Sequence, residues 1–165
     1  MNCQRLCRHL TTSNSQVRRT FPDHSLRAIE AAIKASELAH VGEIRFVVEA
    51  ALDIAPLWRG QTARERAIEV FSQLHVWDTE YNNGVLVYLL LAERDVEIIA
   101  DRGISAKVSQ EQWQAICREM EAAFGQSKYE VGVISGIQAI SRHLTNTFPA
   151  RDAGRNELPN HPIVL

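Results

Sequence analysis

The residues with the clearest capacity for chemistry lie in two short polar segments on either side of a predicted β-hairpin. Asn82-Asn83-Gly84 precedes the apolar run 85–92, and Asp101-Arg102-Gly103 follows the returning strand 95–100. A hairpin reverses the chain, so the start of its first strand lies beside the end of its second. We therefore expect the two segments to meet at one end of a sheet and to gather oxygen-bearing side chains and glycines there.

Oxygen-bearing side chains gathered in this way can bind a hard cation. Carboxylates that lie close together repel, so they take up protons, separate into water or share a cation. Ligand sets made only of oxygen suit calcium or magnesium. The predicted metal ligands are Glu43, Asp78, Asn82, Asn83 and Asp101. Arg102 is the predicted phosphate-binding residue, because a guanidinium holds phosphate bidentately. Asn, Asp and Gly are also ordinary turn formers, so a solvated loop is the alternative interpretation.

The elements around the hairpin predict an α/β fold. Hydrophobic spacing predicts a helix over residues 22–42, a strand over 43–51 and a helix over 62–74, with two more helices at 109–125 and 128–144. A helix between the first two strands makes them parallel with a right-handed crossover. The expected architecture is a three-layer α/β/α sandwich with a small mixed β-sheet. His40 and Glu43 should then lie at the same end as the two polar segments.

Three regions are expected along the chain. Residues 1–20 are polar and aperiodic, which predicts a flexible N-terminal tail or an arm that orders only against the domain. Residues 21–147 form the predicted domain, within which 53–60 reads as a loop. Residues 148–165 contain three prolines and end in an apolar tip, which predicts a C-terminal coil that docks on the body.

Composition restricts the classes of function. The 165 residues are 45% hydrophobic and 23% charged, with a net charge of −2 and a pI near 6.3, which argues against a nucleic-acid partner. The longest apolar run is too short to span a bilayer, and the N-terminus lacks the apolar core of a signal peptide. We expect a cytoplasmic protein without an integral membrane segment. The Arg-rich, acid-free start leaves open a transit peptide or a weak attraction to anions.

The three cysteines do not form a disulfide framework, because their number is odd and their spacing is sparse. Cys117 lies on an apolar helical face and is expected in the core. Cys3 and Cys7 together with His9 are one ligand short of a closed zinc site, so a tail without metal is the favoured interpretation.

The segment 82–104 resembles the central motif of the TPM domain family. The matching features are an Asn-Gly-Val-Leu entry at 83–86, the charged turn Glu93-Arg94 and a glycine exit at Gly103. An amphipathic helix at 113–124 and a final helix at 129–144 follow in the family's order. The resemblance covers residues 22–146. The family includes an acid phosphatase-like protein of the thylakoid lumen and many bacterial proteins, so we expect a bacterial protein.

The resemblance implies an α/β/α sandwich and, as in some relatives, calcium or another divalent cation at the loops flanking the hairpin. Asn82, Asn83 and Asp101 match the motif positions nearest that region, and Asp78 is a weaker match. Asp101-Arg102-Gly103 replaces the family's common Gly-Tyr-Gly-like exit, which affects ligand preference. No signal peptide or C-terminal anchor is recognised, which argues against a lumenal or periplasmic repair role.

Two functions follow as hypotheses. The first is a binding or interaction module with a divalent-cation site and an unidentified protein partner. The alternative is a metal-assisted acid phosphatase of low activity, in which a cation polarises the phosphoryl group and Arg102 steadies its charge. Asp78 or Asp101 would then hold the metal and Glu43 would act as the base.

Overall fold

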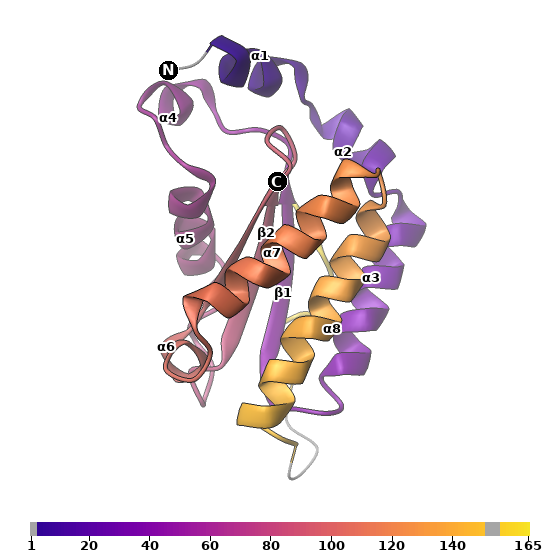
Figure 1. Cartoon of the computed structure of the whole chain (residues 1–165), viewed down its shortest axis with the longest axis vertical. Coiled ribbons are helices and arrows are strands. Elements are labelled where there is room, and N and C mark those ends of the chain that lie inside the picture. The colour runs from indigo at the N-terminus through magenta and orange to yellow at the C-terminus, as the bar shows by residue number, and fades with distance from the viewer. Residues whose placement is uncertain (1–2, 151–155) are drawn as a thin grey trace.

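The structure, a computed structural model, describes residues 3–150 and 156–165. Figure 1 shows helices on both sides of a central sheet. The helices are α1 (Cys3–Thr11), α2 (Asn14–Thr20), α3 (Asp23–Ser36), α4 (Ile54–Trp58), α5 (Ala63–Gln73), α6 (Arg102–Ser105), α7 (Gln110–Gly125) and α8 (Tyr129–Thr147). The strands are β1 (Glu43–Glu49), β2 (Gly84–Leu90), β3 (Asp95–Ala100) and β4 (Ile163–Val164).

The sheet has the strand order β3-β2-β1-β4. β1 and β2 run parallel, and β2 and β3 form the antiparallel hairpin, so the predicted topology of these three strands is confirmed. β4 pairs in parallel with β1 through Val47 and Val48. The docking of the apolar C-terminal tip is therefore confirmed, and it adds a short edge strand where only coil was expected.

Two separate cores flank the sheet and confirm the three-layer sandwich. On one face, β1 side chains such as Phe46 and Val48 pack against α2, α3, α7 and α8. On the other face, Val47, Leu86 and Tyr88 pack against α4 and α5. Every residue of β1 and of β2 is buried, as expected for strands that are covered on both sides.

Local signals in the sequence explain where several helices begin. Thr62 caps α5 and Ser109 caps α7, and each forms a capping box with the residue three positions later. The predicted buried face of α7 is confirmed, including Cys117. On α5, Ile68 lies on the outer side and is 48% exposed. The buried side of α5 is formed instead by the small residues Ala63 and Ala67 together with Val70.

The N-terminal residues differ from the expected polar, aperiodic tail. Residues 3–20 form α1 and α2, so the alternative of an arm ordered against the domain is the one that the structure supports. His9 is buried, where its ring accepts from the backbone N–H of Leu52 (3.0 Å) and contacts the carboxylate of Glu93 (2.7 Å). Arg5 also pairs with Glu93, at 2.8 Å. The sequence of α1 has no regular hydrophobic pattern, and these contacts with distant residues hold the helix against the domain.

Further differences are smaller. The predicted loop 53–60 contains the short helix α4, and α3 ends at Ser36 rather than at Gly42. The domain boundaries at residues 21 and 147 stay predictions. Across residues 3–150 and 156–165, no helix is both long and apolar enough to cross a membrane.

Candidate functional site

The three strand tips that carry the predicted site lie side by side. Glu43 pairs with Gly84 at the start of β1 and β2, and Ala100 at the end of β3 pairs with Val85. Two main-chain hydrogen bonds join the polar loops, because Asp101 N donates to Gly84 O (2.9 Å) and Gly103 N donates to Asn82 O (3.0 Å). The expected meeting of the two polar segments is therefore confirmed.

Gly84 and Gly103 make this close approach possible. A Cβ atom added at Gly84 would lie 1.9 Å from the carbonyl oxygen of Val76. One added at Gly103 would lie 2.6 Å from the carbonyl oxygens of both Tyr81 and Asn82. Glycine is therefore required at both positions because a side chain would not fit, and not because the backbone is left-handed. The residue with a left-handed backbone in this region is Asn82, with φ 51°.

Two acceptor oxygens on the strand-tip loops have no donor among the described residues. Asn83 is fully buried; its Nδ2 donates to Val41 O (2.8 Å), while its Oδ1 is buried without a hydrogen-bond partner. Asp101 caps α6 by accepting from Arg102 N through Oδ1 (2.7 Å), and its Oδ2 is also buried and unpaired. A buried polar atom without a partner is uncommon and needs a physical reason.

The other predicted site residues have different surroundings. Asn82 Oδ1 accepts from Arg102 Nε (2.8 Å), which orients an otherwise exposed guanidinium. Glu43 is buried, and its carboxylate accepts from the backbone N–H groups of Glu157 and Leu158, both at 3.1 Å. Asp78 is exposed. Among the residues that the structure describes, no three His, Cys, Asp or Glu side chains form a metal-binding group. Any cation here would therefore depend on amide and backbone oxygens as well.

Beside this cluster lies a hollow of about 340 Å³ that sequence reasoning did not anticipate; we call it the Glu37 pocket. It is lined by Glu37, His40, Glu43 and Asn160, among others. Asn160 Nδ2 donates to Glu37, whereas Asn160 Oδ1 and His40 Nε2 are buried without partners in the described residues. His40 was expected near this end of the sheet. Glu37 and Asn160 were missed, because α3 was predicted to continue past Glu37 and Asn160 arrives on the C-terminal segment.

Burial changes proton affinity in the Glu37 pocket. Burial, reinforced by the negative charge of Glu43, raises the pKa of Glu37 to about 7. Burial also raises the pKa of Glu43 and lowers the pKa of His40. Desolvation penalises the charged form in each case. The pocket therefore contains a carboxyl group that exchanges its proton near neutral pH.

This proton should make stability depend on pH. The folded chain holds the proton on Glu37 up to about pH 7, whereas the unfolded chain releases it near 4.5. The free energy of unfolding should therefore fall as pH rises from about 4.5 to 7, by about 1–2 kcal/mol after allowing for solvent screening. Urea unfolding of wild type and Glu37→Gln across this range measures the effect. Equal slopes in the two proteins would show that Glu37 is not responsible.

The fold and the strand-tip loops together define a class of protein. It is a three-layer α/β/α domain with a mixed sheet, in which an Asn-Gly entry and a glycine exit meet at the open end of the central hairpin. The chain belongs to the TPM domain family, whose model matches residues 18–143.

Solved structures of the same fold are similar to this chain. The BA42 protein from the psychrophilic bacterium Bizionia argentinensis, solved by NMR, is 29% identical, with a TM-score of 0.76 over 86% of this chain and 93% of that one. The N-terminal domain of a protein from P. gingivalis, also solved by NMR, is 17% identical, with a TM-score of 0.62 over 83% and 90% of the two chains. The second likeness shows the fold alone. No curated protein matches the chain.

Proposed function

We propose that this TPM domain is a binding module whose loops around Asn83 and Asp101 hold a divalent cation. The observation that carries the proposal is the pair of buried, unpaired acceptors, Asn83 Oδ1 and Asp101 Oδ2, on two loops tied together by main-chain hydrogen bonds. An unsatisfied buried acceptor costs about 1–3 kcal/mol. A bound cation would interact with both oxygens and offset this cost.

The surroundings favour calcium over magnesium and predict weak binding. Calcium accepts amide and carbonyl oxygens in flexible geometry, whereas magnesium demands a nearly ideal octahedron. Of Asn83 and Asp101, only Asp101 carries a carboxylate. Because calcium binds more weakly when it has few charged ligands, we expect a dissociation constant of about 0.1–1 mM. Asn82 and Glu43 already accept hydrogen bonds, and we assign them to shaping the loops. Asp78 remains a candidate for the rim.

A binding role is supported by aromatic side chains on the same loop. Trp77 is 47% exposed and Tyr81 is 52% exposed, and both lie on the segment that leads into Asn82 and Asn83. Aromatic residues are enriched where proteins contact partners. A cation that fixes this segment would also fix the surface offered to a protein partner.

The phosphatase alternative receives less support from the geometry. It assigns Glu43 as the base, but both oxygens of that carboxylate already accept backbone N–H groups. It also requires Arg102 to hold a phosphoryl group, while Arg102 Nε is bound to Asn82. Turnover of p-nitrophenyl phosphate with calcium, magnesium or manganese, lost in Asp101→Asn, would favour the enzyme instead.

Calorimetry on wild type and Asp101→Asn tests the proposed site. Asparagine keeps the shape of the side chain and an oxygen for capping α6, but it replaces the unpaired carboxylate oxygen by an amide. We expect calcium affinity to fall by about tenfold or more, since a charged ligand is lost.

The matched control is Glu80→Gln, which removes the same charge from an exposed position on the neighbouring turn. Its calcium affinity should stay within about twofold of wild type, because exposed charges interact weakly. Equal losses in the two variants would indicate a diffuse electrostatic effect. The absence of both heat and thermal shift in wild type would remove the cation from the proposal.

A further inference from the structure

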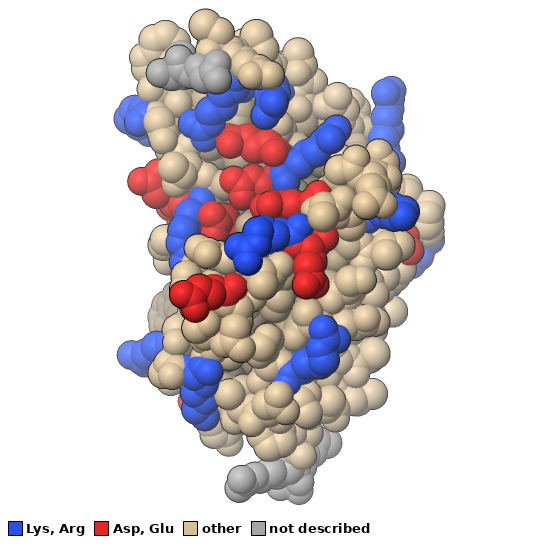
Figure 2. Space-filling view, viewed as in Figure 1, with Lys and Arg blue, Asp and Glu red and all other residues tan. Residues whose placement is uncertain are grey.

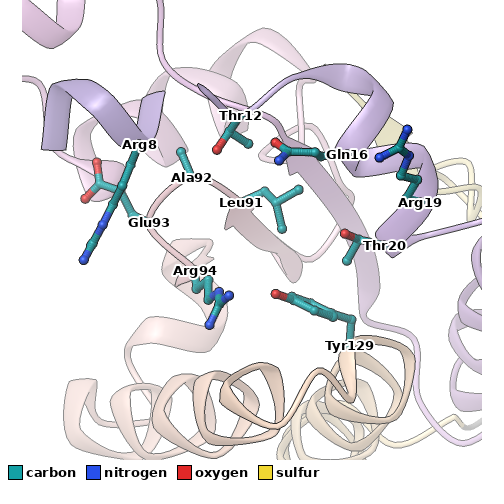
Figure 3. Close-up of a pocket in the computed structure, with 10 residues that line it drawn as sticks. All are labelled: Arg8, Thr12, Gln16, Arg19, Thr20, Leu91, Ala92, Glu93, Arg94 and Tyr129. Carbon is teal, nitrogen blue, oxygen red and sulfur yellow. The ribbon is translucent and has the colours of Figure 1, made fainter. Parts of the chain in front are cut away.

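A second hollow lies at the opposite end of the sheet, around the turn between β2 and β3. It has a volume of about 520 Å³, and we call it the arginine pocket. Four elements build it: α1 and α2 above, the hairpin turn on one side and the start of α8 below (Figure 3). Its lining residues are Arg8, Thr12, Gln16, Arg19, Thr20, Leu91, Ala92, Glu93, Arg94 and Tyr129.

The lining carries an excess of positive charge. Within the described residues, the side chains of Arg8, Arg19 and Arg94 form neither an ion pair nor a hydrogen bond. Glu93 is the one carboxylate in the lining, and it is already engaged by Arg5 at 2.8 Å and by His9 at 2.7 Å. Figure 3 shows the guanidinium of Arg94 directed into the hollow, while those of Arg8 and Arg19 lie at its margins and point away from its centre.

The polar groups converge rather than line one wall. In Figure 3 the guanidinium of Arg94 and the hydroxyl of Tyr129 point toward one another across the hollow, while Thr12 and Gln16 lie above them. Arg94 has a left-handed backbone, φ 54°, at the tight turn, which fixes where its side chain leaves the hairpin. The buried residues Leu91 and Ala92 supply an apolar floor.

We propose that the arginine pocket binds a small phosphomonoester. A dianionic phosphomonoester has three non-bridging oxygens arranged around a tetrahedral phosphorus, and guanidinium and hydroxyl donors arriving from different elements match it better than they match a single planar carboxylate. The volume leaves room for an organic group beyond the phosphate, which would lie against Leu91, Ala92 and the ring of Tyr129. The pocket is separate from the proposed cation site, because the two lie at opposite ends of the hairpin.

Two observations favour a small ligand that is particular to this chain. Arg8, Thr12 and Gln16 precede residue 18, where the match to the TPM domain begins, so α1 and the first part of α2, which lie outside the family match, contribute to one wall of the pocket. Figure 2, drawn from the side of Figure 1, shows acidic and basic side chains interspersed over the upper half of this face. A continuous basic surface, as expected for nucleic-acid binding, is not present on the face that is drawn.

NMR-detected titration of the full chain tests the proposal with inorganic phosphate, adenosine monophosphate and adenosine as probes. We expect phosphate to bind with a dissociation constant of about 1 mM and the monophosphate to bind more tightly. Adenosine should not bind measurably. Arg94→Gln should weaken binding of the monophosphate by about fivefold or more, and Arg8→Gln, whose charge lies at the margin of the pocket, should weaken it by about twofold. Arg8 is exposed on a helix, so its variant also controls for misfolding at the strained turn.

The matched control is Arg18→Gln, which removes the same charge from α2 outside the pocket and should leave the affinity unchanged. Asp101→Asn should also bind the monophosphate like wild type, which separates this proposal from the cation site. The proposal fails if neither phosphate probe binds. It fails equally if adenosine binds as well as its monophosphate, or if Arg18→Gln weakens binding as much as the pocket variants do.

Discussion

Replacing Gly84 by alanine should destabilise the domain by about 3 kcal/mol or more, the largest effect that we expect from removal of space alone. The new methyl group would lie 1.9 Å from the carbonyl oxygen of Val76. That oxygen belongs to backbone, which cannot move aside as a flexible side chain can. Relief would require the start of β2 to separate from its neighbours and would disturb the adjoining Asn83. Thermal unfolding should show a midpoint lowered by about 6–12 °C.

Gly125→Ala is the matched control. Nothing lies within 4 Å of a Cβ atom added at Gly125, which ends α7, so this variant should be neutral or slightly stabilising. If the two variants unfold at the same temperature, then the tight approach of the strand tip to Val76 does not determine the geometry of this end of the sheet.

Replacing Glu49 by alanine should cost about 3 kcal/mol, because it removes the acceptor of the buried Tyr88 hydroxyl and the more buried of the two carboxylates that pair with Arg66. The Glu49 carboxylate accepts from Arg66 Nε (2.9 Å) and Arg66 Nη2 (3.1 Å), and it also accepts from the hydroxyl of Tyr88 at 2.6 Å. Tyr88 is fully buried. The loss would leave the Tyr88 hydroxyl without its acceptor between the sheet and α5, and it would leave the Arg66 guanidinium with only the more exposed Glu69. Urea unfolding gives the free energy directly.

Glu69→Ala separates the buried network from ordinary surface pairing. Glu69 also pairs with Arg66, at 3.2 Å, but half of its side chain is exposed, so its removal should cost less than about 1 kcal/mol. Tyr88→Phe should fall between the two variants, at about 1–2 kcal/mol, because a single hydrogen bond is lost. Similar costs for Glu49→Ala and Glu69→Ala would contradict a specific buried network.

The part of the fold that could be predicted from the sequence is the part fixed by local patterns. The uniformly apolar run before Glu93-Arg94 identifies a strand covered on both faces, and the capping boxes locate α5 and α7. α1 and β4 escaped prediction because distant partners hold them in place. The buried His9 anchors α1 to residues more than forty positions away, and β4 is a two-residue strand that pairs with β1.

The candidate site could likewise be predicted only in part from the sequence. The meeting of Asn82 and Asn83 with Asp101 follows from the direction of three strands, which hydrophobic spacing reveals. The surroundings of each side chain do not follow from it. The backbone of Glu157 and Leu158 satisfies Glu43, and Asn160 completes the Glu37 pocket, because the C-terminal segment crosses this end of the sheet. No local spacing signals a contact over more than one hundred residues.

A calcium titration followed by amide NMR signals tests the central claim most directly. If a cation is held between Asn83 and Asp101, the largest shifts should fall on residues 82–84 and 101–103, saturate at millimolar calcium and disappear in Asp101→Asn. Signals around the Glu37 pocket should change less, and those of the arginine pocket should not change. Unchanged spectra, or saturable shifts confined to another part of the molecule, would contradict the assignment of a cation to these loops.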